Sequence, residues 1–188
     1  MVKRAFDLTA ALILSVLLAV PAAILMLLIR LDSPGPAIFR QERLGKNGKP
    51  FMILKLRSMR LDAEKNGPRW AERNDSRCTR LGSFLRRSRL DELPQLWNIL
   101  HGEMSFVGPR PERAYFYDQF EKTIPGFRNR LAVIPGLTGL AQVNGGYDLS
   151  PEQKIVFDMK YIENCCVGMD LSCMLKTVRL VFTHEGAR

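Results

Sequence analysis

Histidine is scarce in this chain, and its cysteines show no metal-binding spacing. The 188 residues include two histidines, His101 and His184, and four cysteines without a Cys-x-x-Cys pair. A zinc site or a histidine-based catalytic relay is therefore a poor fit to the sequence. Cys165 and Cys166 are adjacent, which suits a disulfide framework badly. We therefore expect a reducing, cytosol-facing compartment.

Acidic residues are fewer than basic ones, 19 against 28, so the formal net charge is +9. The excess lies in residues 40–90, which hold 15 basic and 5 acidic side chains. Such a block binds the phosphates of a nucleic acid, an anionic lipid or a phosphorylated substrate. The sequence lacks a recognition helix, a zinc module and an aromatic RNA-binding signature, so we expect no nucleic-acid partner.

Formal charge is absent from residues 8–29, a run of 22 residues that is long enough to cross a bilayer as a helix. Pro21 interrupts the run, and proline removes a helical hydrogen bond, so a break is expected near Val20. The segment is either a kinked span or a re-entrant hairpin. Basic residues on both sides suggest two cytoplasmic flanks, but the residues alone leave both topologies open.

The remainder of the chain predicts a mixed, α+β fold. Short strands are expected at 37–39 and 51–54, on either side of a turn at 45–48. Apolar residues at helical spacing predict three helices, at 91–104, 113–120 and 171–182. Strands and helices do not alternate regularly, which argues against a doubly wound parallel sheet.

The last of these helices has an apolar face with two explanations. Core packing is the usual one for such a stripe, and lying in a membrane interface is the alternative. The face consists of Leu171, Met174, Leu175, Val178, Val181 and Phe182.

Two adjacent carboxylates, Asp91 and Glu92, follow three arginines in the segment RRSRLDELPQ (86–95). In a purely structural role, Asp91 would cap a helix and Glu92 would suit its first turn. In a functional role, arginines and helix-terminal amides gather phosphates, and a carboxylate among them can attack phosphorus or bind Mg²⁺. Adjacent carboxylates do not flank a sugar from opposite sides, which argues against a glycosidase.

Three further motifs carry groups suited to phosphate or sugar binding. Lys55 and Arg57 are two apart and would face the same side of a strand. Arg110 lies between two prolines, which would fix its backbone. The glycine-rich loop 135–145 supplies neutral hydrogen-bonding groups. Taken alone, each motif also has an ordinary structural explanation, as a solvated strand, a rigid turn or a surface loop.

In this order the motifs resemble the bacterial sugar transferase family, the monotopic polyprenyl-phosphate phosphoglycosyl transferases. The resemblance runs over essentially the whole chain. Its most specific segments are LDELPQL (90–96), GEMS (102–105) and VGPRP (107–111), and KLRSM (55–59), PGLTGLAQVNG (135–145), Tyr161 and Asp170 also fit.

The resemblance implies a transferase that moves a sugar-1-phosphate from a UDP-sugar to undecaprenyl phosphate and releases UMP. This reaction would start an exopolysaccharide, a capsule or another surface glycan. The segments 111–113 and 145–147 favour UDP-glucose or UDP-galactose as the donor. A homo-oligomer is compatible with the resemblance.

The resemblance also implies the architecture. Residues 1–32 would form a re-entrant membrane helix broken at Pro21, and residues 33–188 a catalytic domain continuous with it. Amphipathic helices would lie in the membrane interface, with a small β-sheet around the active site. The expected location is the cytoplasmic face of the bacterial inner membrane.

Residue roles follow from the resemblance in the same way. Asp91 would be the nucleophile that forms an aspartyl-phosphosugar intermediate, and it would bind Mg²⁺, the expected cofactor. Glu92 would support metal binding or proton handling. The expected substrate-binding residues are Lys55, Arg57, Arg86, Pro109, Arg110, Thr138 and Gln142.

Overall fold

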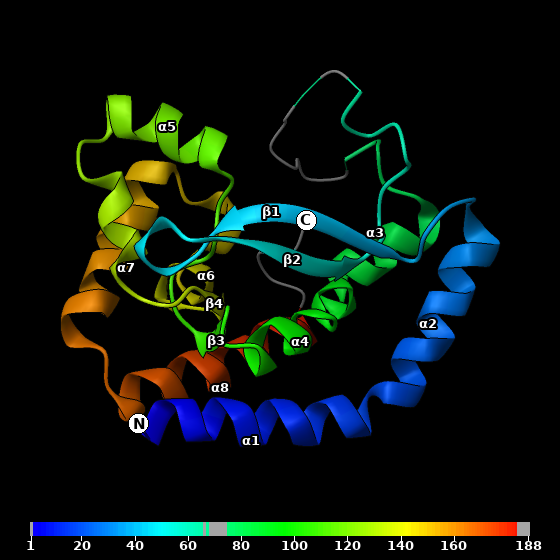
Figure 1. The fold of residues 1–188 in the computed structure, drawn as a ribbon, viewed down its shortest axis with the longest axis horizontal. Coiled ribbons are helices and arrows are strands. Elements are labelled where there is room, and N and C mark those ends of the chain that lie inside the picture. Colours follow the sequence, from blue (N-terminus) through cyan, green and yellow to red (C-terminus); the bar gives the residue numbers. More distant parts are fainter. Residues whose placement is uncertain (1, 66, 68–74, 184–188) are drawn as a thin grey trace.

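The computed structural model describes residues 2–65, 67 and 75–183 and confirms the α+β prediction. Figure 1 shows helices arranged around a two-stranded hairpin. The helices are α1 (Val2–Leu17), α2 (Ala19–Asp32), α3 (Arg80–Arg87), α4 (Gln95–Leu100), α5 (Ala114–Thr123), α6 (Leu140–Val143), α7 (Pro151–Asn164) and α8 (Val167–Thr183). The strands are β1 (Ile38–Leu44), β2 (Pro50–Leu56), β3 (Ser105–Val107) and β4 (Gly136–Thr138).

The strands form two small sheets where one was expected. β1 and β2 pair antiparallel over their whole length, with Ile38 opposite Leu56, and they contain the two predicted strands. β3 and β4 pair parallel and form a separate sheet. This second pair is short because the Gly-Pro-Arg-Pro turn follows β3 directly, and proline cannot donate to a strand ladder.

The glycines of the 135–145 loop serve backbone packing. A Cβ on Gly136 would lie 2.1 Å from the backbone nitrogen of Gly108, and one on Gly139 would lie 2.2 Å from the Gly108 carbonyl oxygen. Glycine is therefore needed where this loop crosses the turn at 108–111. The loop and the Arg110 turn are held as one unit.

The apolar run is divided into two helices, α1 and α2, that meet at a bend of 60°. The break lies at Leu18, slightly before the predicted position near Val20. Proline affects the residue four positions earlier, so Pro21 leaves the carbonyl of Leu17 without its helical donor. Within the described residues no single helix is long and apolar enough to cross a membrane, whereas the bent pair meets that test as a unit.

The first turns of α1 are attached to the folded body by polar contacts. Lys3 forms an ion pair with Asp170 of α8 at 2.6 Å. Arg4 donates to two carbonyls at the end of α4, at 2.7 and 3.1 Å. Asp7 is buried and accepts a hydrogen bond from the backbone of Phe106 at 3.2 Å. These contacts place the start of the apolar segment against the rest of the fold.

The end of α2 is attached to the same body through Arg57. Its buried guanidinium donates to the carbonyls of Ile29 (3.3 Å), Ser33 (2.6 Å) and Pro34 (2.8 Å). Arg57 lies just beyond β2, which ends at Leu56, so strand alternation does not relate its direction to that of Lys55. Arg57 borders the functional cavity, but its donors hold the loop after α2.

The predicted helix at 91–104 is shorter in the structure. A 3₁₀ turn, η2 (Leu90–Glu92), precedes α4, and the chain turns back at Gly102, whose φ is +80°. Asp91 lies inside this turn and does not cap a helix, which corrects the structural explanation considered for it. The predicted helices at 113–120 and 171–182 are confirmed as parts of α5 and α8.

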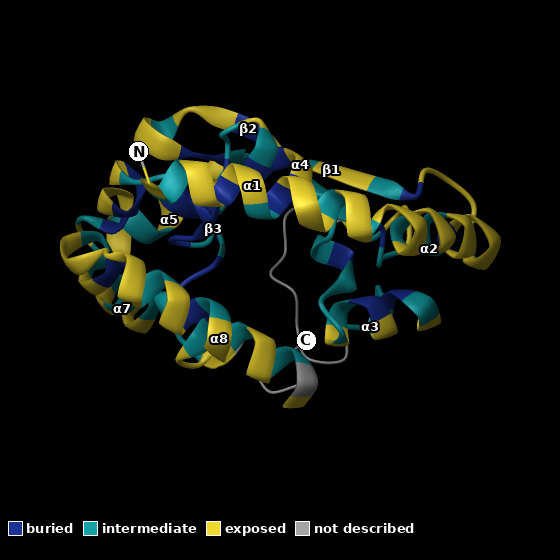
Figure 2. Ribbon diagram, turned by 90° about the horizontal axis from the view of Figure 1, so that it is seen from below, coloured by how far each residue is buried: buried dark blue, intermediate teal, exposed yellow. Residues whose placement is uncertain are grey.

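The apolar face of α8 is exposed, so its expected core packing is wrong for most of the stripe. Leu171, Leu175 and Val178 are 47%, 71% and 55% exposed, whereas Cys173 is buried. Seen from below, α1 and α8 lie along one side of the molecule and are largely exposed (Figure 2). The side chain of Phe182 lies outside the described residues.

Candidate active site

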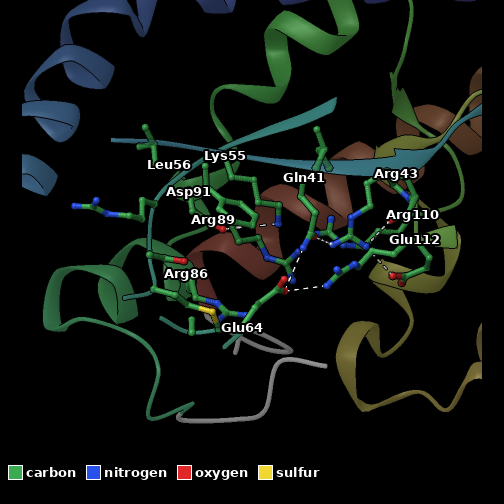
Figure 3. A pocket seen from close by; sticks show the side chains of 18 of the residues that line it. Gln41, Arg43, Lys55, Leu56, Glu64, Arg86, Arg89, Asp91, Arg110 and Glu112 are labelled. Atoms are coloured by element: carbon green, nitrogen blue, oxygen red, sulfur yellow. Dashed lines mark hydrogen bonds and ion pairs between the residues drawn. The ribbon is translucent and has the colours of Figure 1, made fainter. Parts of the chain in front are cut away.

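A cavity of about 450 Å³ opens between the β1–β2 hairpin, the segment 57–64, η2 and the turn at 108–111. Basic side chains dominate its lining, as Figure 3 shows for Lys55, Arg86, Arg89 and Arg110. The basic block of the sequence therefore contributes to an enclosed site, which suits a small phosphorylated ligand.

Asp91 lies at the wall of this cavity and is buried. Its Oδ2 is 3.9 Å from the Nζ of Lys55, and within the described part of the chain its carboxylate accepts no hydrogen bond. Arg89, two residues earlier, has a left-handed backbone (φ 57°), which turns the chain so that Asp91 follows on the cavity side. The Asp91 oxygens are thus available to a ligand.

Glu92 has a different environment from its neighbour. Both guanidinium nitrogens at the tip of Arg110 donate to its carboxylate, and Lys55 Nζ lies 3.4 Å from its Oε1. Glu92 is not among the residues that line the cavity. It therefore holds Lys55 and Arg110 in place beside Asp91, a positioning role that the sequence did not separate from metal or proton chemistry.

The two carboxyl groups are shifted in opposite directions. Burial raises the pKa of Asp91, Lys55 opposes that rise, and the charge of Glu92 adds to it. Burial would also raise the pKa of Glu92, but Arg110 and Lys55 outweigh it and lower this pKa to about 2. Two cations thus favour the charged form of Glu92, whereas burial disfavours the charged form of Asp91.

Arg86 and Gln142, two of the expected substrate-binding residues, both border the cavity. Arg86 also donates to the Sγ of Cys78 at 3.2 Å. The amide nitrogen and oxygen of Gln142 are buried and have no partner among the described residues. An unsatisfied amide with one donor side and one acceptor side suits a base or a sugar substituent.

Two of the expected substrate-binding residues, Pro109 and Thr138, are not among those that line the cavity. The hydroxyl of Thr138 lies 2.6 Å from that of Thr177 on α8, and Thr138 does not border the cavity. The carbonyl of Pro109 accepts a hydrogen bond from the backbone of Gly136 at 2.9 Å. Both expectations followed from a motif, and a motif does not show which of its side chains point outward.

Sequence analysis did not find Arg130, which also borders the cavity. It is buried against Asp158, a residue 28 positions later in the chain. No local pattern marks either residue, because their proximity depends on how α7 packs against the segment Phe127–Ala132 (η3).

A magnesium ion fits the donor set around Asp91 only if the substrate supplies further ligands. Within the described residues no group of three His, Cys, Asp or Glu side chains could hold a metal ion. Mg²⁺ commonly binds one or two carboxylates together with substrate phosphates and water. Asp91 offers one such carboxylate, whereas Glu92 is engaged by cations.

The chain matches a protein-family model described as bacterial sugar transferase over residues 1–184. It belongs to this family. An Aeromonas hydrophila relative, named UDP-N-acetylgalactosamine-undecaprenyl-phosphate N-acetylgalactosaminephosphotransferase, is 42% identical over 190 residues, covering all of this chain and 45% of its own length. A Bacillus subtilis (strain 168) protein, named as a putative undecaprenyl-phosphate N-acetylgalactosaminyl 1-phosphate transferase, is 55% identical over 131 residues, 69% of this chain and 73% of its own.

A third relative of this sugar transferase is named for a different donor. The UDP-glucose:undecaprenyl-phosphate glucose-1-phosphate transferase of Caulobacter vibrioides is 44% identical over 190 residues, 98% of this chain and 71% of its own length. The chain thus spans less than half of the Aeromonas protein and about seven-tenths of the other two. The names of all three describe sugar phosphotransferases that act on undecaprenyl phosphate.

Proposed function

We propose that this sugar transferase moves a sugar-1-phosphate from a UDP-sugar to undecaprenyl phosphate, releases UMP and so starts a surface glycan. The observation that carries the proposal is the Asp91 carboxylate, buried without a hydrogen-bond partner at the wall of a basic cavity. The cavity has the charge to hold a diphosphate. The names of the family members support this donor and this acceptor.

In the proposed mechanism, an Asp91 oxygen attacks the phosphorus next to the sugar. A phosphorus–oxygen bond forms to Asp91, the bond to UMP breaks, and UMP leaves with the electron pair. An oxygen of undecaprenyl phosphate then attacks the same phosphorus, and the Asp91 carboxylate is released. Because no hydrogen-bond donor among the described residues occupies the Asp91 carboxylate, its lone pairs are available for this attack.

The other side chains bind and orient the donor. Lys55 and Arg110, held by Glu92, present positive charge beside Asp91. Arg86 adds a further cation along the cavity wall, and the Gln142 amide offers hydrogen bonds to the nucleoside or the sugar. A Mg²⁺ ion carried in by the diphosphate and bound by Asp91 would neutralise charge between the two anions.

A re-entrant membrane segment on the cytoplasmic face of the bacterial inner membrane completes the proposal. Both ends of the α1–α2 pair are tied to one folded body, through Lys3 and Arg4 at the start and Arg57 at the end. A spanning segment would separate its ends by the thickness of the bilayer. The exposed apolar faces of α1 and α8 would lie in the interface near the lipid substrate.

The reaction is tested by measuring UMP release from detergent-solubilised protein with Mg²⁺ and undecaprenyl phosphate. The donor panel is UDP-glucose, UDP-galactose and UDP-N-acetylgalactosamine. We expect release with at least one donor and an at least ~10³-fold loss in Asp91→Asn, because an amide cannot replace the attacking carboxylate. No release by folded wild-type protein across the panel would contradict the proposed function.

The covalent step needs a separate experiment. Wild-type protein is incubated with a UDP-sugar labelled in its sugar, without undecaprenyl phosphate. We expect protein-bound label and one UMP per site, with the label chased from the protein when the lipid acceptor is added. Glu92→Gln, which keeps the Asp91 nucleophile, is the matched control and should still accumulate label slowly. UMP release that requires the acceptor would exclude the intermediate and leave direct transfer.

A further inference from the structure

Arg130 of η3 and Asp158 of α7 form a buried ion pair beside the candidate active site. Arg130 Nε lies 2.6 Å from Asp158 Oδ2, and the two side chains are 2% and 1% exposed. The guanidinium lies over the rings of Phe127 and Tyr117, at 4.7 and 5.8 Å from their centroids. Packing from both aromatic residues leaves the guanidinium little freedom to move.

The same guanidinium reaches the turn that carries Arg110. Arg130 Nη2 donates to the backbone carbonyl of Arg110 at 3.1 Å. In the same turn, the carbonyl of Pro109 accepts the hydrogen bond from Gly136. Two successive carbonyls of a proline-flanked turn are therefore each held by a more distant segment. The Arg110 side chain then extends to Glu92 next to Asp91.

Stability does not explain why this pair is charged. Arg130 Nη1 and Asp158 Oδ1 are buried and have no partner in the described part of the chain. A buried ion pair with unsatisfied atoms is commonly no more stabilising than apolar side chains of the same volume. The feature that apolar residues could not provide is the hydrogen bond to the Arg110 carbonyl.

We propose that Arg130, oriented by Asp158, is a positioning residue that fixes the Arg110 turn so that the Arg110 guanidinium meets Glu92 and the donor's diphosphate. This inference rests on the proposed transferase function. Arg130 acts through Arg110. A small displacement of the Arg110 turn would therefore lower the rate, because orienting groups work only within narrow geometric limits.

Two variants test the role. Arg130→Met combined with Asp158→Leu removes both charges and keeps the volume, and such replacements are often tolerated. Arg130→Lys keeps a positive charge next to Asp158. It removes the planar guanidinium, which donates to Asp158 and to the Arg110 carbonyl at the same time. For both variants we expect a thermal midpoint near that of wild type and an at least tenfold loss in kcat/KM for the UDP-sugar, mainly through kcat.

The deciding readout is a double-mutant cycle with Arg110→Ala. If Arg130 acts through Arg110, adding Arg130→Lys to Arg110→Ala should lower kcat/KM by less than about twofold further. If Arg130→Lys lowered kcat/KM by the same factor in wild type and in Arg110→Ala, the inference would be overturned. Wild-type kcat/KM in either folded Arg130 variant would do so as well.

The matched control is Arg128→Met with Asp118→Leu, an ion pair at the same segment whose side chains are 44% and 61% exposed. We expect unchanged kcat/KM there. If both Arg130 variants fail to fold, the pair is structural and the inference is wrong. Lack of UMP release by wild-type protein contradicts the proposed function instead, so the two failures are distinguishable.

Discussion

Asp91 and Glu92 are neighbours with opposite electrostatic environments. Glu92 is bound by two cations and keeps its charge, whereas Asp91 is buried with Lys55 3.9 Å away and Glu92's charge beside it. Glu92 thus organises the neighbouring cations, whereas the oxygens of Asp91 are available to a ligand. We expect the different environments of Asp91 and Glu92 to affect the stability of the protein as well as its activity.

Replacing Asp91 by Asn should stabilise the fold while abolishing transfer. The pKa of Asp91 is raised in the folded protein, so its ionisation costs folding free energy as pH rises through and above its ordinary value. We expect Asp91→Asn to have a higher Tm than wild type at neutral pH, with the gap closing toward about pH 4. Thermal unfolding in detergent between about pH 4 and 8 checks this. A lower Tm at neutral pH would contradict the raised pKa.

Glu92→Gln should have the opposite effect. The pKa of Glu92 is lowered to about 2, so its ionised form contributes stability that is complete above about pH 5 and is lost as pH falls toward 2. At neutral pH we expect Glu92→Gln to lower the free energy of unfolding by roughly 2–4 kcal/mol, from about 1.4 kcal/mol for each pKa unit. Denaturant unfolding at about pH 7 and pH 3 measures the difference, which should shrink at the lower pH.

At the scale of single elements, one close backbone approach and one helix break shape the fold around the candidate site. The β3–β4 pair brings the 135–145 loop against the Arg110 turn at Gly108 and Gly136. The break at Leu18 lets α1 lie along the body while α2 departs at 60° (Figure 1). The first feature places the turn that carries Arg110, and the second shapes the apolar segment.

Gly136→Ala should destabilise the fold, because its Cβ would lie 2.1 Å from the backbone nitrogen of Gly108 and backbone must shift to accept it. We expect a loss of several kcal/mol in the free energy of unfolding, and a loss of transfer activity. Gly168→Ala is the matched control, since its Cβ would meet only Cys166 Sγ at 4.0 Å in α8. That variant should be as stable as wild type or about 1 kcal/mol more stable. Similar Tm values for Gly136→Ala and Gly168→Ala would contradict the requirement for glycine at position 136.

The topology of the bent pair can be measured at its two ends. Cysteine is introduced at Val2 or at Leu31, both exposed residues at opposite ends of the α1–α2 pair, in a background with the native cysteines replaced. A re-entrant segment keeps both thiols on the cytoplasmic side. We expect neither to react with an impermeant maleimide in intact spheroplasts and both to react after permeabilisation. Labelling of one end in intact spheroplasts would show a spanning segment.

At the scale of the whole molecule, polar and apolar features lie on different sides. The basic cavity opens between the hairpin and η2, whereas exposed apolar side chains follow α1 and α8 along the lower side in Figure 1. The Lys3–Asp170 ion pair ties these two helices together, and Asp170 also accepts a hydrogen bond from Tyr161 at 2.7 Å. Under the proposed function, membrane contact and donor binding would therefore use separate surfaces of one body.

Charge on α8 should weaken membrane binding. Leu171→Glu combined with Leu175→Glu places two carboxylates on its exposed apolar face. We expect several-fold less protein to float with vesicles containing anionic lipid, with Tm unchanged. Tyr115→Glu, an exposed position on α5 away from α1, is the control and should float like wild type. Equal flotation of all three proteins would exclude α8 from the membrane surface.

The sequence by itself determined the local features of this protein. Pro21 dictates the helix break because it lacks an N–H, two short apolar segments around a turn predict the β1–β2 hairpin, and the order of the motifs carries the family. Asp91 and Arg110 stand in motifs that are local in the chain, and the resemblance to the family implied their expected roles. In each case the cause lies within a few residues of its effect.

The tertiary structure decided which of the marked side chains reach the cavity. Thr138 contacts Thr177 of α8 and does not border the cavity. Arg57 borders the cavity, but its guanidinium donates to carbonyls 23 or more residues away. On the α8 stripe, Leu171, Leu175 and Val178 are exposed. The pairing of Arg130 with Asp158, and of Glu92 with Arg110, depends on how distant segments pack. Local spacing places a side chain on a face of its element, but only long-range packing determines what that face meets.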